Sequence, residues 1–443
     1  METELQYYDV FPRVVRENRK TRITIRPRGL HAAFTEAEYV VMPIPMDRQV
    51  DRPGDGPHRI EKLDVPLIPV RPVDGALSFE HVFEGEQMYS LAVRPGSMEM
   101  QPVVECSVYC LKDDWCGLLP YKMETHCHTD RSDGLESPSF VPPYYRELGY
   151  EALSITDHHK YEPSLEAIQA FKGLDTHFKL YPGEEVHAPG NLVHIVNFAG
   201  SCSVNTWIRG NPETYQAQVQ EIMAGEKIPA SIGIRQIASC IWVSRKIRET
   251  GGLSVMAHPH WRPLQNGAKI NYSISTEAFL FLLENHVFDA WEIFGFSPER
   301  NNTHMALYLE AMQKGIGIPV LGANDSHGVA GNLQWFDKAY TVVLAEENTK
   351  EALISGIKKG LCAAVEQQDG TPGRVIGNPR MMRFTRFLLD SFYPLYQLHC
   401  RNEGMLMKQY VAGVPGAGEA YKVMAGHAEM FKRQFFHGTG FHY

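Results

Sequence analysis

Met123-Glu-Thr-His-Cys-His-Thr-Asp-Arg-Ser-Asp-Gly134 is the segment around which the rest of the sequence can be organised. Residues 121–125 alternate as a short β-strand does, and side chains two apart on a strand share a face. His126 and His128 are therefore predicted to point to one side. The turn formers Ser132-Asp133-Gly134 allow the Asp133 carboxylate to fold back toward the two imidazoles. The alternative is that both histidines are ordinary polar strand residues.

The composition is that of a large globular protein. The chain has 443 residues, 44% of them hydrophobic, which allows a sizeable core and a second domain. Its formal net charge of −9 argues against a long nucleic acid as partner, because such proteins carry a basic surface against the phosphates. No apolar run approaches the roughly 20 residues that span a bilayer, and the N-terminus lacks signal-peptide features. We expect a cytoplasmic, non-membrane protein whose eight cysteines are free thiols.

Three regions of different character follow one another. Residues 1–118 hold short β-rich runs between Pro- and Gly-containing turns, which predicts an N-terminal antiparallel β-sandwich domain. Residues 119–365 alternate between strand and helix patterns. Residues 366–443 are predicted to form a C-terminal helical extension. For the N-terminal domain, two interpretations stay open: a binding module or lid, and a packing module that would make the protein a homo-oligomer.

The middle region predicts an α/β fold with a parallel sheet, because strands and helices alternate along it. Strands are expected near residues 122–125, 152–155, 178–181, 192–197, 253–257, 290–294 and 320–322. Helices are expected at residues 163–177, 212–224, 232–250, 276–284 and 299–314. Seven strand units are enough to close the sheet into a TIM-like barrel.

Side chains that can bind metals recur at all but one of these strands. They lie in His126-Cys-His128, Thr156-Asp-His-His159, Pro182-Gly-Glu-Glu185, His194, Ala257-His-Pro-His260 and Asn324-Asp-Ser-His327. A single histidine at a strand end is usually an ordinary loop residue. Repetition at successive carboxyl ends favours a functional site, because barrel enzymes gather their functional groups at that rim. The sequence therefore predicts a site for several metal ions.

These motifs resemble, in order along the chain, those of the polymerase and histidinol phosphatase (PHP) superfamily. The matching segments are His126-Cys-His128 with Ser132-Asp-Gly134, Ile155-Thr-Asp-His158, Gly183-Glu-Glu185, Met256-Ala-His-Pro259 and Gly322-Ala-Asn-Asp-Ser-His327. A leading β-rich domain is similar to the arrangement in the CehA/McbA-like metallohydrolases of that superfamily. The resemblance covers residues 119–365. It implies a distorted seven-stranded (β/α)7 barrel that binds two or three divalent metal ions.

The resemblance also implies how nine residues share these ions. The first ion would be bound by His126, His128, Glu185 and Asp325, the second by Glu185, His194 and His258, and the third by Asp133, His158 and His327. Mixed imidazole and carboxylate ligands suit Mn, Zn or Fe. Glu184 and Cys127 are expected to lie outside the ligand set. Asp157 is expected either to orient a ligating imidazole or to bind directly.

This ligand set predicts a metal-dependent hydrolase. Two ions that share a carboxylate can share a water whose pKa falls to about 7, and the resulting metal-bridging hydroxide would attack a phosphomonoester or a small phosphodiester. The partner would be a small anionic, phosphorylated substrate, because a third ion can neutralise phosphoryl oxygens. His159 and His260 are the candidates to protonate the leaving group. Arg262 could bind a phosphate bidentately, with Arg209 and Arg235 as alternatives.

Two other functions stay open. The same cluster could hydrolyse a carboxyl or carbamate aryl ester, a reaction that the CehA/McbA-like resemblance includes. Aromatic residues expected near the rim would suit an apolar leaving group; they are Trp207, Trp261, Phe296 and Trp335. The other function is that of a non-catalytic, metal-stabilised binding module.

Overall fold

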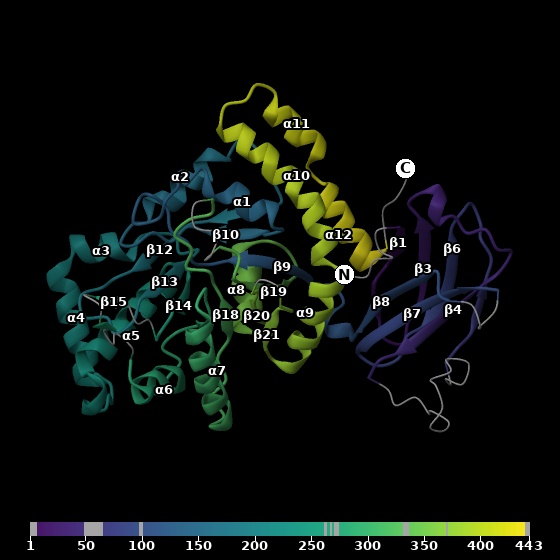
Figure 1. Ribbon diagram of the computed structural model, residues 1–443. Coiled ribbons are helices and arrows are strands. Elements are labelled where there is room, and N and C mark those ends of the chain that lie inside the picture. Colours follow the sequence, from purple (N-terminus) through teal and green to yellow (C-terminus); the bar gives the residue numbers. More distant parts are fainter. Residues whose placement is uncertain are drawn as a thin grey trace. The chain divides into compact units, whose positions relative to one another are not determined.

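The protein is described by a computed structural model that covers residues 7–47, 65–96, 101–260, 264–265, 268–269, 274–330, 336–368 and 371–438. The chain divides into two compact units (Figure 1). One unit comprises residues 1–118, 386–399 and 426–443, and the other comprises residues 119–385 and 400–425. The C-terminal residues therefore contribute to both units.

The first unit is built from two sheets among its described residues. The three-stranded sheet has the order β1 (Tyr8–Phe11), β3 (Lys20–Pro27), β6 (Leu77–Val82). The five-stranded sheet has the order β2 (Val14–Arg16), β8 (Val104–Leu111), β7 (Gln87–Pro95), β4 (Tyr39–Pro45), β5 (Ile68–Val70). Alternating residues are buried, as Ile23 and Ile25 of β3 and Leu77 and Phe79 of β6 show. The predicted β-rich character is confirmed, and the sandwich stays a prediction.

The described strands of the second unit belong to two larger sheets and a small hairpin. The six-stranded sheet has the order β11 (Lys179–Tyr181), β10 (Ala152–Ser154), β9 (Leu119–Glu124), β19 (Ala339–Ala345), β20 (Cys362–Glu366), β21 (Arg374–Gly377). The five-stranded sheet has the order β12 (Gly183–Val186), β13 (Ile195–Phe198), β14 (Leu253–Met256), β17 (Ala290–Phe294), β18 (Val320–Gly322). Strands β15 (Leu264–Gln265) and β16 (Ala268–Lys269) form the hairpin.

Strand directions within these sheets are mixed. Strands β9, β10 and β11 run parallel, as do β14, β17 and β18. The expectation of a wholly parallel sheet is wrong at β13, which is antiparallel to both β12 and β14, and at β19, which is antiparallel to β9. Strands β12 and β13 are joined only by residues 187–194, and a parallel connection would need a longer crossover.

The two large sheets meet where their parallel strands end. An isolated bridge pairs Cys127 with Ser326 and links the chain beyond β9 to the chain beyond β18. A second one pairs His158 with Glu185 and links the chain beyond β10 to β12. Apolar side chains of both sheets share one buried cluster that contains Met123, Val255 and Leu321. The mixed α/β class is confirmed. A continuous seven-stranded barrel stays a prediction.

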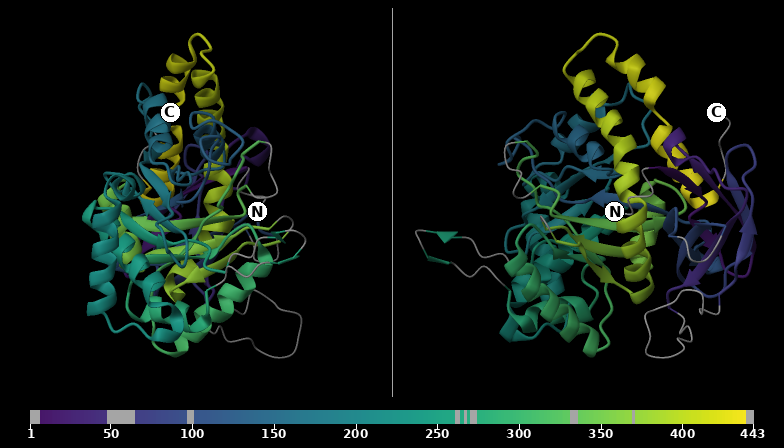
Figure 2. Two further views of the ribbon diagram at one scale, coloured as in Figure 1. Left: turned by 90° about the vertical axis from the view of Figure 1, so that its left-hand side faces the viewer. Right: turned by 45° about the vertical axis from the view of Figure 1, so that its right-hand side comes forward.

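Helices cover the sheets of the second unit (Figures 1 and 2). They are α1 (Val141–Glu147), α2 (Glu162–Ala170), α3 (Val204–Gly210), α4 (Pro212–Gly225), α5 (Ile234–Glu249), α6 (Thr276–Glu284), α7 (Pro298–Gln313) and α8 (Lys350–Lys358). The C-terminal helices are α9 (Pro379–Ser391), α10 (Tyr393–Val411), α11 (Ala417–Met424) and α12 (His427–His437). Helix α5 buries Ile237, Val243 and Ile247 completely, as its apolar periodicity predicts. Within the described residues, we find no helix with the length and apolarity needed to cross a bilayer.

Candidate metal centre

The structure brings all nine predicted ligands together at one edge of the second unit. They follow β9, β10, β14 and β18, or lie at the junction of β12 and β13. Because β12 and β13 are antiparallel, the end of β12 with Glu185 and the start of β13 next to His194 reach the same edge. Five overlapping groups of three or four of these and neighbouring side chains offer donor atoms within 4.8 Å of one another.

The first group surrounds Glu185 and Asp325 with two buried imidazoles. Nε2 of His128 lies 3.0 Å from Oδ1 of Asp325 and 3.7 Å from Oε2 of Glu185. Nε2 of His126 lies 3.4 Å from Oδ1 of Asp325 and 3.5 Å from Oε1 of Glu185. Ligands bound to one ion at about 2.1 Å are separated by roughly 3.4 Å, so each of the two carboxylates is spaced to share an ion with these imidazoles.

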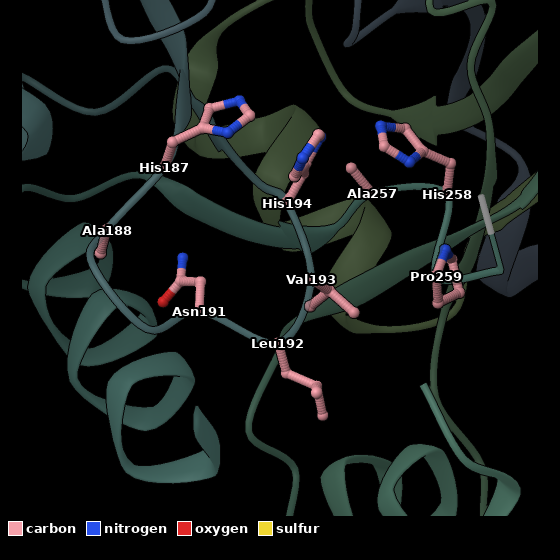
Figure 3. A pocket seen from close by; sticks show the side chains of 9 residues that line it. All are labelled: His187, Ala188, Asn191, Leu192, Val193, His194, Ala257, His258 and Pro259. Carbon is pink, nitrogen blue, oxygen red and sulfur yellow. The ribbon is translucent and has the colours of Figure 1, made fainter. Parts of the chain in front are cut away.

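The second group adds two imidazoles to the other side of Glu185. Oε1 of Glu185 lies 2.8 Å from Nδ1 of His194 and 3.3 Å from Nε2 of His258. His194 and His258 also line a cavity of about 230 Å³ (Figure 3). The carboxylate thus faces imidazoles of both groups, which is the arrangement that a bridging ligand requires.

The third group contains the exposed carboxylate of Asp133. Its Oδ2 lies 3.4 Å from Nε2 of His158 and 3.3 Å from Nε2 of His327. The loop that carries it folds back so tightly that a Cβ atom on Gly134 would lie 2.7 Å from the carbonyl of His128. Only glycine fits there without a shift, so Gly134 is what allows Asp133 to return to the histidines.

The donor set fits bound cations. Glu185 is fully buried, with a relative exposure of 0%, and its carboxylate lies within 4.0 Å of six imidazoles. A buried carboxylate needs compensating positive charge. Divalent ions between these side chains would supply it.

Electrostatic interactions within the cluster shift the pKa values of its members strongly. Burial opposes protonation of His158, but hydrogen bonds to Asp133 and Glu185 outweigh burial and raise the pKa of His158 to about 10. Burial lowers the pKa of His128 and of His258. Three residues at this edge also have a left-handed backbone: His159 at φ 61°, His258 at φ 22° and Asp325 at φ 52°. Such strain is concentrated at functional sites.

Glu292 belongs to the site, although sequence reasoning missed it. It is a buried acid in the otherwise apolar strand β17, the one strand to which no ligand was assigned. Its Oε1 lies 2.8 Å from Nδ1 of His126, and its Oε2 accepts a hydrogen bond from the backbone N of His258 at 3.0 Å. A charged residue in the middle of a buried strand was the signal that could have identified it. Glu292 orients His126 so that Nε2 faces Asp325.

His187 is a second residue that was missed. It stands two positions after Glu185, which places both on one face of an extended chain. Its Nε2 lies 2.8 Å from Nδ1 of His158 and 3.3 Å from Oε2 of Glu185. Burial lowers the pKa of His187 to about 4, so its imidazole is neutral and can accept a hydrogen bond from His158 or bind an ion.

Three neighbours of the ligands hold the surrounding chain. Asp157 accepts hydrogen bonds from the backbone N of Thr129 at 2.9 Å and of Ser132 at 3.1 Å, and so holds the loop that leads to Asp133. Glu184 is buried and accepts from Ser203 and Asn205 at the start of α3. Cys127 is buried against the carbonyl of Ser154. These contacts indicate a structural role for Asp157, Glu184 and Cys127.

The predicted catalytic residues lie in different surroundings. His159 is exposed, and its ring centroid lies 4.5 Å from that of His187. His260 is buried, with its ring centroid 5.6 Å from Phe279 and 5.3 Å from His304. Arg262, Trp261 and Trp335 lie outside the described residues.

The two alternative arginines have partners of their own. Arg209 donates to the carbonyl of His159 and to Oγ1 of Thr206, each at 2.9 Å. Arg235 is hydrogen-bonded to Gln216. Both arginines stay predictions as phosphate ligands.

Comparison with known proteins finds structural neighbours of low similarity. No protein-family model and no curated protein matches the chain. A two-domain protein from Bacteroides vulgatus, described as containing a predicted PHP-like metal-dependent phosphoesterase, is 16% identical with a TM-score of 0.39, over 56% of this chain and 65% of that one. A candidate metal-dependent phosphoesterase from Bifidobacterium adolescentis is 18% identical with a TM-score of 0.32, over 46% and 87%. An amidohydrolase from Chromobacterium violaceum, with bound sulfate and no metal, is 17% identical with a TM-score of 0.31, over 47% and 88%.

Proposed function

We propose that the protein is a metal-dependent hydrolase of the PHP superfamily that cleaves a phosphomonoester or a small phosphodiester. The observation that carries this proposal is the position of Glu185. Its buried carboxylate stands between the imidazoles of one group, those of a second group, and a third group around Asp133. A carboxylate in this position can bind two ions, one through each of its two oxygens.

We divide the residues among the ions as the resemblance to the PHP superfamily implies. The first ion is assigned to His126, His128, Glu185 and Asp325, the second to Glu185, His194 and His258, and the third to Asp133, His158 and His327. Imidazole and carboxylate donors select Mn, Zn or Fe. Ions bound by these residues would polarise a phosphoryl oxygen and would lower the pKa of a bound water, which falls from 15.7 to about 7 in zinc sites.

The protein's own residues position the reacting groups. Glu292 fixes the orientation of His126, and Asp157 fixes the loop of Asp133. Of the two candidates for protonating the leaving group, we assign the role to His159, because its ring is exposed beside His187, while His260 packs against Phe279.

A substrate panel tests this function. The purified protein would be loaded with Mn²⁺ and given p-nitrophenyl phosphate, bis-p-nitrophenyl phosphate and naphthyl carboxylic esters. We expect turnover of a phosphate ester that is abolished in Glu185→Gln and unchanged in His177→Ala, an exposed surface control. Turnover of carboxylic esters alone would overturn the assignment.

Hydrolysis of a carboxyl or carbamate aryl ester is the second candidate, and one observation favours it. The cavity beside His194 and His258 is also lined by the apolar side chains of Ala188, Leu192, Val193 and Pro259, with the polar Asn191 among them (Figure 3). Such a wall suits an apolar leaving group. The third candidate, a metal-stabilised binding module, predicts a lower melting temperature on chelation and no turnover of either substrate class.

A further inference from the structure

Arg300 is a buried cation, and two of its three side-chain nitrogens have no hydrogen-bond partner among the described residues. It lies in the first turn of α7 and is only 8% exposed. Neither Nε nor Nη2 has a hydrogen-bond partner in the part of the chain that the structure describes. An isolated guanidinium is costly to bury, so side chains of this kind are normally paired.

Arg146 shows what a purely structural arginine looks like in the same unit. It is fully buried, and both Nε and Nη2 donate to Oε2 of Glu403, at 2.8 and 2.7 Å. Its Nη1 donates to the carbonyl of Tyr150 at 3.0 Å. Arg300 has no such partners, although it is buried almost as deeply.

The guanidinium of Arg300 lies where β17 and β18 end, beside the metal centre. A methyl group placed on Gly295, directly after β17, would lie 3.1 Å from Nη2 of Arg300 and 3.6 Å from the carbonyl oxygen of Ala323, directly after β18. Cζ lies 4.9 Å from the ring centroid of Phe296, which supports the planar group. The carboxylates of Asp325 and Glu292 are near enough to act on it electrostatically, yet neither is hydrogen-bonded to it.

His304 adds a second unsatisfied atom on the same helix. It follows Arg300 by four residues and therefore lies on the same helical face. Its Nδ1 lies 3.0 Å from the carbonyl of Ile293, to which it donates, which leaves Nε2 as an acceptor. Nε2 is buried, and no described residue is hydrogen-bonded to it. Two donor nitrogens of Arg300 and one acceptor nitrogen of His304 thus lie on the same face of α7.

We propose that Arg300 binds a phosphoryl oxyanion of the substrate, with the acceptor Nε2 of His304 available to a protonated oxygen of the same group. A phosphoryl group matches the guanidinium because its oxygens can accept both N–H bonds at once. Asp325 would offset the positive charge of Arg300 less once it bound a cation. The charge of Arg300 would then be better balanced by an anionic substrate. This inference rests on the proposed function, since it names the group that the same centre would recognise.

Binding of inorganic phosphate tests the inference without relying on turnover. The Mn²⁺-loaded wild type, Arg300→Met, Arg300→Lys and the matched surface control Arg245→Met would be titrated with phosphate by calorimetry. Arg245 is exposed and paired with Glu226. We expect Arg300→Met to weaken phosphate binding about 10- to 100-fold, the effect of losing hydrogen bonds to a charged group. Arg300→Lys should fall between, and Arg245→Met should match the wild type.

Melting temperature separates this role from a structural one. Removing a buried, unpaired charge should leave Arg300→Met as stable as the wild type or more stable. The inference would be overturned if folded Arg300→Met bound phosphate as tightly as the wild type does. It would also be overturned if both Arg300 variants lost stability while their folded fraction kept wild-type phosphate affinity. If the wild type hydrolyses no phosphate ester, the proposed function fails, but the difference in phosphate affinity still tests Arg300.

Discussion

Oε1 of Glu292 lies 2.8 Å from Nδ1 of His126, and both side chains are almost completely buried. The contact joins residues 166 positions apart in the chain. It leaves Nε2 of His126 as the atom that faces Glu185 and Asp325. An acid behind a ligating imidazole fixes the orientation of the ring and strengthens it as a donor.

Replacing Glu292 by glutamine should therefore weaken metal binding. Loss of such a partner typically reduces metal affinity by about 10- to 100-fold, and competition with a chromogenic chelator would measure it. Glu226→Gln, on an exposed side chain, is the matched control. An unchanged metal affinity in Glu292→Gln would show that metal binding by His126 does not depend on Glu292.

His187 should matter to the ion beside His158. Because its Nε2 lies 2.8 Å from Nδ1 of His158, His187→Ala should lower the affinity for that ion about tenfold and change the absorption spectrum of the Co²⁺-substituted protein. The exposed His177→Ala should do neither. Identical Co²⁺ spectra for His187→Ala and the wild type would remove His187 from the centre.

Asp157 should contribute to folding as well as to the site. Asp157→Ala leaves the backbone N–H groups of Thr129 and Ser132 without their acceptor. We expect the free energy of unfolding to fall by about 1–3 kcal/mol in urea titrations, together with loss of one bound ion. Asp130→Ala, at an exposed position in the same loop, should cost much less. Equal stabilities for the two variants would contradict this role.

Metal binding should release protons. The pKa of His158 is about 10 in the metal-free protein, above its usual 6.5, so the ring is protonated at pH 7 and must lose a proton to bind an ion. Metal affinity should therefore rise with pH up to about 10, by about tenfold per unit for each proton displaced. Calorimetry at pH 7 in two buffers of different ionisation enthalpy measures the proton number. Equal heats in both buffers would contradict the prediction.

The sequence predicts the site better than it predicts the sheets. His126, His158, His258 and Asp325 could be found because ligands follow strand ends, and strand ends can be recognised locally. The antiparallel direction of β13 depends on how β12, β13 and β14 pair, which no local pattern reveals.

The supporting residues were harder to recognise for a related reason. Glu292 lies inside an apolar strand, and its function depends on a partner 166 residues away. Arg300 resembles any charged residue in the first turn of a helix until its burial is known. Partners of this kind are fixed by tertiary contacts and have no motif of their own.

We propose that nine side chains from across the second unit bind ions together. Elemental analysis of the protein after chelation, reconstitution with Mn²⁺, Zn²⁺ or Fe²⁺ and desalting tests it most directly, in the wild type and in Glu185→Gln. We predict that the wild type retains two or three ions per chain and that Glu185→Gln retains at most one. A wild-type protein that retains none of the three metals would contradict the account.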